Sequence, residues 1–139
     1  MKSVKVIVEI AAPAQRVFQT LCDVERWPEW TPTMQSVQRL DSGPFKVGSR
    51  ARVVQPKLRP SLWEVSSMDE DRNFNWLSAT PGLRMDAGHA VESVAGGCRV
   101  TLTFALSGLL SPLVSLLYGG LIATYVNTEA EGLKRHCEI

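Results

Sequence analysis

The feature that most constrains this chain of 139 residues is an uncharged run, since residues 100–128 contain no Asp, Glu, Lys or Arg. Residues 98–107 alternate between apolar and polar side chains, which predicts a half-buried strand. Residues 112–137 contain no proline after Pro112 and predict a long helix, with Ser111 placed to cap it. At 1.5 Å per residue this helix is about 39 Å long, whereas a domain of this size has a radius of gyration of roughly 14 Å. The helix must therefore cross the whole domain.

The chain before this run predicts one strand, two short helices and a meander of further strands. Residues 3–10 alternate in polarity, which is typical of a half-buried strand. Pro13 suits the first turn of a short helix, while Pro28 and Pro32 limit the following segment to a broken helical turn. Turn signals then recur about every ten residues, which favours antiparallel neighbours. The strands expected there comprise residues 34–41, 49–56, 61–68, 74–80, 83–94 and 98–107.

These elements predict a single domain, residues 1–139, of the α+β class. The apolar strand faces must be covered, and the long helix is the only large element that can cover them. We therefore expect a curved antiparallel sheet of about seven strands wrapped around the C-terminal helix, with two short helices after the first strand. Because a curved sheet and one helix rarely fill the space between them, we also expect a ligand cavity there.

The net charge and the cysteine and histidine content indicate which kinds of partner and cofactor to expect. The net charge is only +1, so no general electrostatic attraction to nucleic acid is expected. Three cysteines form no CxxC pair and two histidines lack metal-ligand spacing, so we expect free thiols, no metal and no cofactor. Lys5 and Glu9 interrupt the apolar residues near the N-terminus, which leaves no signal-peptide core and predicts a cytoplasmic location.

The most distinctive aromatic residues are Trp27 and Trp30, which lie within two residues of Pro28 and Pro32. One interpretation is a hydrophobic plug that pins the connection between helix and strand. The other is a gate whose rings cover the cavity and contact a ligand, since an indole combines a large apolar area with one N–H donor. Trp63 and Trp76 lie within expected strands and point inward, either as core residues or as cavity lining.

Two side chains are candidates for proton transfer. His89 shares a strand face with apolar neighbours, and in that position it either acts as a general acid or base or serves as a hydrogen-bonded structural residue. Tyr125 on the long helix is the second candidate, and its hydroxyl also suits the orientation of a ligand carbonyl or hydroxyl.

The long helix raises two further questions. Gly119 and Gly120 are adjacent inside it, and each costs roughly 1 kcal/mol relative to alanine. Close contact with the sheet, room for a ligand, or a bend in the helix would each account for them. The helix face away from the sheet, expected to include Val114, Tyr118 and Ile122, favours a homodimer or transient membrane contact.

Several stretches resemble the START-like (SRPBCC) superfamily, and most closely its polyketide cyclase/dehydrase-like branch. They are IAAPAQRVFQTLCDVERWPEWTPTM, GSRARVVQPKLRPSLWEV, FNWLSATPG, GHAVE and TEAEGLKR. The resemblance covers nearly the whole chain and implies a helix-grip fold with a deep apolar cavity between sheet and C-terminal helix. Members of this superfamily bind lipids, polyketides, hormones or other apolar molecules, and some are cyclases. No catalytic motif common to the superfamily can be carried over.

The sequence thus favours binding of a hydrophobic small molecule, lipid or polyketide-like, for carriage, storage or sensing. One alternative is a cyclase/dehydrase-type enzyme that uses the same cavity, with His89 or Tyr125 moving protons. Another is a protein-interaction module that uses the exposed apolar face of the helix. The residues expected to line the cavity are Trp27, Trp30, Met34, Val53, Gln55, Trp63, Phe74, Trp76, His89, Phe104, Leu117, Tyr118, Leu121 and Tyr125.

Overall fold

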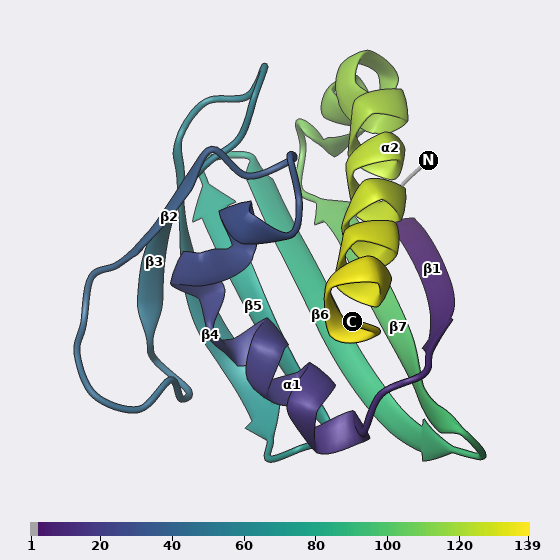
Figure 1. Ribbon diagram of the computed structural model, residues 1–139. Helices are drawn as coiled ribbons and strands as arrows, with labels where there is room; N and C mark the ends of the chain where they lie inside the picture. The colour runs from purple at the N-terminus through teal and green to yellow at the C-terminus, as the bar shows by residue number, and fades with distance from the viewer. Residues whose placement is uncertain (1–2) are drawn as a thin grey trace.

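The computed structural model describes residues 3–139 and contains one antiparallel sheet in the order β1-β7-β6-β5-β4-β3-β2 (Figure 1). The curved sheet, the long C-terminal helix and the two short helices after the first strand confirm the expected α+β helix-grip fold. The elements are β1 (Ser3–Ile10), α1 (Ala14–Cys22), the 3-10 helix η1 (Val24–Glu29), β2 (Ser36–Arg39), β3 (Arg50–Val54), β4 (Ser61–Asp69), β5 (Asn73–Thr80), β6 (Leu83–Val94), β7 (Gly97–Ser107) and α2 (Ser111–Cys137).

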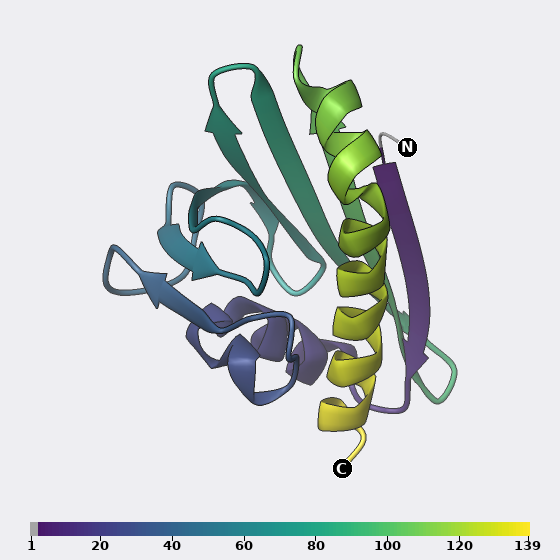
Figure 2. The same ribbon diagram turned by 90° about the horizontal axis from the view of Figure 1, so that it is seen from above.

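Helix α2 runs along the β1–β7 side of the sheet, and α1 contacts β6, β7 and α2 on the same face (Figures 1 and 2). The C-terminal end of α2 is firmly attached, because Lys134 Nζ donates to the Glu9 carbonyl at 2.8 Å and Glu138 accepts the Ala11 N–H at 2.8 Å. The prediction that Ser111 caps the N-terminal end of α2 is wrong. Leu110 occupies the N-cap position, and the Ser111 hydroxyl donates to the Gly108 carbonyl at 2.8 Å.

The inner face of the sheet, which points toward α2, is buried along part of β6 and β7 and partly accessible along another part. Val91 pairs with Val100 across β6 and β7, and both are buried. Ala87 pairs with Phe104 in the same two strands, and both remain partly accessible. Alternation along a strand places all four side chains on the same face. Only a short turn, residues 108–110, separates β7 from α2, so the accessible part at Phe104 is near the start of α2 along the chain, although Leu106 beyond it is buried.

Glycine allows a close approach at Gly132, a position that the sequence did not single out, whereas Gly120 has no neighbour to approach. A Cβ atom at Gly120 would meet nothing within 4 Å, so contact with the sheet does not account for that residue. A Cβ atom at Gly132 would lie 2.1 Å from the carbonyl oxygen of Trp30. The lack of a side chain at Gly132 therefore allows the end of η1 to rest directly on α2.

The apolar face that α2 leaves exposed differs from the one expected. Leu116 is 82% exposed and Leu117 is 64% exposed, whereas Ile122 is only 6% exposed. The expectation for Ile122 is wrong because it lies three residues after Gly119 and four before Val126, and that spacing places all three on the buried side. Among the described residues, no helix is both long enough and apolar enough to cross a lipid bilayer.

Candidate ligand-binding site

Trp27 lies at the centre of an aromatic cluster between η1 and the sheet. Its ring centroid is 5.6 Å from that of Trp30, 5.3 Å from Trp76 and 5.5 Å from His89. The side chain is 2% exposed, and its indole N–H donates to the Leu21 carbonyl at 3.0 Å. Trp27 therefore joins α1 and η1 to the sheet, which is the placement of a plug.

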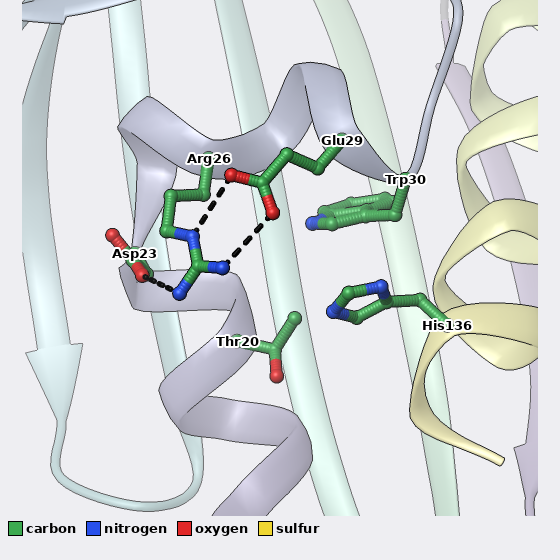
Figure 3. A pocket seen from close by; sticks show the side chains of 6 residues that line it. All are labelled: Thr20, Asp23, Arg26, Glu29, Trp30 and His136. Carbon is green, nitrogen blue, oxygen red and sulfur yellow. Dashed lines mark hydrogen bonds and ion pairs between the residues drawn. The ribbon is translucent and has the colours of Figure 1, made fainter. Parts of the chain in front are cut away.

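Trp30 lies at the edge of this cluster and borders a small polar hollow between α1, η1 and the end of α2 (Figure 3). The hollow has a volume of about 60 Å³, and its lining includes Thr20, His136 and the ion pair of Arg26 with Glu29. The indole nitrogen of Trp30 points toward it and is buried, with no hydrogen-bond partner among residues 3–139. At roughly 30 Å³ per water molecule, this hollow suits water and is too small for a lipid-sized ligand.

His89 is held in a neutral state within the same cluster. Its ring stacks on Phe74 with centroids 4.2 Å apart, and Nδ1 lies 3.1 Å from the Phe74 carbonyl oxygen. Burial lowers the pKa of His89 from 6.5 to about 4, against the opposing effect of that hydrogen bond. A carbonyl only accepts, so Nδ1 carries the proton, and Nε2 can act as a hydrogen-bond acceptor or a base.

Two connections near the sheet edge formed by β2, β3 and β4 make hydrogen bonds to α2. In the β3–β4 connection, the Pro56 carbonyl accepts a hydrogen bond from the Tyr125 hydroxyl. In the η1–β2 connection, the Thr33 hydroxyl donates to Glu129 Oε2 at 3.0 Å. Tyr125 and Glu129 are four residues apart and lie on one side of α2, so this side of the helix faces both connections.

Glu129 is the polar residue that the sequence analysis missed. Its side chain is partly accessible, while burial raises the pKa of its carboxyl from 4.5 to about 7, against the opposing effect of the Thr33 hydrogen bond. The carboxyl is therefore largely protonated in mildly acidic solution. One signal was available, because Glu129 follows Tyr125 by one helical turn and is the first charged residue after the uncharged run.

The structure gathers most of the predicted lining residues on one side of the sheet. Trp63 links Trp76 and Phe104, with ring centroids 5.6 Å and 6.3 Å away. Leu117 and Tyr118 are the exceptions, because both are exposed. A stripe with a spacing of four residues drifts by about 40° per step, so Leu117 lies about 120° around α2 from Glu129, on the exposed side. The others are either buried (Met34, Val53, Trp63, Phe74 and Trp76) or partly accessible (Gln55, Phe104, Leu121 and Tyr125).

A second hollow, of about 810 Å³, lies mainly on the outer face of the sheet. Its lining includes Ala90 and Glu92 of β6 and Arg99 of β7. Arg99 pairs there with Glu9 and Glu92 at 3.1 Å each. This hollow is open and charged, so it differs in chemistry from the apolar inner face. Within residues 3–139, no three His, Cys, Asp or Glu side chains gather closely enough to hold a metal ion.

Comparison with known proteins agrees with the geometry. The family described as polyketide cyclase/dehydrase and lipid transport matches residues 1–138. Uncharacterized proteins of Mycobacterium tuberculosis and Mycobacterium bovis are 27% identical over 106 residues, which is 70% of this chain and 61% of theirs. The chain thus spans about three-fifths of the length of these relatives.

Solved structures share the fold at low sequence identity. A Thermus thermophilus protein has a TM-score of 0.78 at 20% identity, covering 96% of this chain and 94% of its own. The Zhui aromatase/cyclase from a Streptomyces species has a TM-score of 0.79 at 16% identity, covering 99% and 93%. A START superfamily protein from Mycobacterium smegmatis has a TM-score of 0.77 at 16% identity, covering 99% and 98%.

Proposed function

Because the chain belongs to the polyketide cyclase/dehydrase and lipid transport family, we propose that it binds an apolar small molecule between the inner face of the sheet and α2. The ligand is lipid-like or polyketide-like, and binding serves carriage, storage or sensing. The supporting observation is the accessibility of Ala87 and Phe104, which point inward yet are not sealed by α2. Apolar surface that faces the interior and remains partly accessible is where a ligand gains affinity, at roughly 25 cal/mol per Å² buried.

The side chains around this opening suit such a ligand. Met85 and Leu121 add partly accessible apolar surface from β6 and α2, and the ring of Phe104 lies against Trp63. Few polar groups border this surface, and the Tyr125 hydroxyl is already engaged by Pro56. An apolar surface with a few fixed polar groups is typical of small-molecule sites.

A proton-transfer enzyme of the cyclase/dehydrase type is the second candidate. It is supported by the opposite directions in which burial shifts the pKa values of Glu129 and His89. In mildly acidic solution Glu129 holds its proton, because burial raises its pKa to about 7, while His89 is neutral, because burial lowers its pKa to about 4. Acid and base are then available on one domain. Loss of turnover but not of binding in a His89→Phe variant would favour this candidate over carriage.

Two substitutions on one strand test the binding proposal. Ala87 is on the inner face of β6, and Ala90, three residues later, is on its outer face and lines the outer hollow. Ala87→Phe should fill the inner opening and weaken binding of the apolar dye Nile red at least tenfold. Ala90→Phe should leave binding unchanged. The opposite pattern would place the dye in the outer hollow and contradict the proposal.

A further inference from the structure

We infer that Glu129 is the hydrogen-bond donor that orients the ligand, which assigns to this protein a largely apolar ligand with a carbonyl or hydroxyl oxygen. The inference rests on the proposed function and adds to it the chemical class of the ligand. Its basis is the arrangement of two buried threonines and one partly accessible carboxyl side chain where the η1–β2 connection meets α2.

Glu129 is deep in the protein and accessible at the same time. Protein atoms surround its carboxyl closely enough to penalise its charge, yet the side chain keeps accessible surface. The carboxyl of an ordinary surface glutamate is accessible and has few protein atoms around it. A core side chain is surrounded by protein atoms and has no accessible surface. Both properties suit a carboxyl that a ligand reaches from between the η1–β2 connection and α2. Tyr125, one helical turn away on the same side of α2, is also partly accessible.

We take the Thr33 hydroxyl as the donor to Glu129, which assigns the proton of the neutral carboxyl to its other oxygen. The Thr33 hydroxyl donates its only hydrogen to Glu129 Oε2, at 3.0 Å. Thr31 Oγ1 lies 2.9 Å from Thr33 Oγ1, so in this pair Thr31 must be the donor. Both threonines are buried, which keeps this chain of donors in place. Because Oε2 is an acceptor, the proton of the neutral carboxyl is on Oε1, and Oε1 makes no hydrogen bond within residues 3–139.

Burial keeps the Glu129 carboxyl largely neutral below about pH 7, against the opposing effect of the Thr33 hydrogen bond on its pKa. The η1–β2 connection presents the hydroxyls of Thr31 and Thr33, and α2 presents Tyr125, whose hydroxyl is bonded to Pro56. Among residues 3–139, no lysine, arginine or histidine lies within 4 Å of the carboxyl, and His136 of the same helix is exposed. A neutral carboxyl that offers O–H to an apolar space pairs with a ligand oxygen, because either group left unpaired there is costly.

The experiment compares two ligands of similar shape, benzophenone and diphenylmethane. Benzophenone has a carbonyl between its two phenyl rings, where diphenylmethane has a methylene. Each competes with Nile red for the wild-type protein and for three variants. Glu129→Leu removes the donor, Glu129→Gln keeps an N–H donor that does not ionise, and Glu131→Leu changes an exposed neighbour as the control. The quantity compared is the preference, defined as the ratio of the dissociation constants of diphenylmethane and benzophenone.

The preference for benzophenone should fall about five- to tenfold in Glu129→Leu, the value of one hydrogen bond. It should persist in Glu129→Gln and in Glu131→Leu. In the wild type it should be present at about pH 5.5 and lost at about pH 8.5, while Glu129→Gln should keep it at both. The pH series and the Gln variant test the inference even where Glu129→Leu fails to fold.

Two other results would each overturn a different statement. Equal preference in wild type and Glu129→Leu, unchanged by pH, would overturn the role of Glu129 and leave apolar binding intact. Failure of Nile red and of both competitors to bind the wild type would contradict the proposed function, and this inference with it.

Discussion

The pH dependence of stability should contain two opposing contributions that largely cancel in the wild type. Glu129 has a folded pKa of about 7 against 4.5 for the free group, and His89 has a folded pKa of about 4 against 6.5. Each difference is about 2.5 pH units, which at 1.36 kcal/mol per unit gives about 3 kcal/mol for each residue.

The signs follow from the number of protons that each state binds. The folded-state pKa of Glu129 is raised, so its contribution to the free energy of unfolding is fully present below about pH 4.5 and is lost as the pH rises through 7. The folded-state pKa of His89 is lowered, so its contribution is present above about pH 6.5 and is lost as the pH falls through 4. Between about pH 4.5 and 6.5 the two slopes are equal and opposite.

Single substitutions should separate the two contributions. In Glu129→Gln the contribution of His89 is no longer cancelled by that of Glu129, so the free energy of unfolding should rise by about 3 kcal/mol from pH 4 to pH 7. In His89→Phe it should fall by a similar amount over pH 4.5 to 7.5. Urea unfolding followed by tryptophan fluorescence at several pH values measures both slopes, and Glu131→Gln is the matched control. Parallel pH profiles for wild type and Glu129→Gln would refute the assignment of a buried, neutral Glu129.

Three further outcomes can be checked by thermal or urea unfolding. Gly120→Ala should stabilise the protein by about 1 kcal/mol, because the new methyl group enters open space and alanine favours a helix; a loss of stability would mean that the helix needs a bend there. Gly132→Ala should destabilise it by roughly 1–3 kcal/mol, since the methyl group must displace the Trp30 carbonyl, and an unchanged midpoint would show that η1 yields freely. Trp27→Phe should cost about 1–3 kcal/mol, because the Leu21 carbonyl loses its indole donor within the core; near-wild-type stability would exclude a plug role for Trp27.

Local pattern was sufficient to predict the architecture. Alternation over residues 3–10 and 98–107 predicted β1 and β7 to within one residue, because each strand has one buried and one exposed face. Residues 112–137 predicted α2 with one residue missing at its start. The length of that helix relative to the domain required it to cross the sheet, and the structure confirms this arrangement.

The site was less predictable, because its properties arise where distant segments meet. Glu129 reads as an ordinary surface glutamate until the η1–β2 connection places Thr33 against it. Gly132 differs from Gly120 only through the backbone of Trp30, which no local pattern shows. Leu117 looks like part of the same stripe as Tyr125, but the gradual drift of that stripe around α2 carries it to the exposed side. In each case the sequence provides the residue, and the tertiary contact decides its role.

The most direct measurement is a titration of the isotopically labelled protein with benzophenone, followed by NMR of the backbone amides. Saturable shifts at Ala87, Phe104 and Tyr125 are the predicted result, because these residues border the accessible part of the inner face. Shifts confined to Ala90 and Arg99 on the outer face, or none at any concentration, would contradict binding between the sheet and α2.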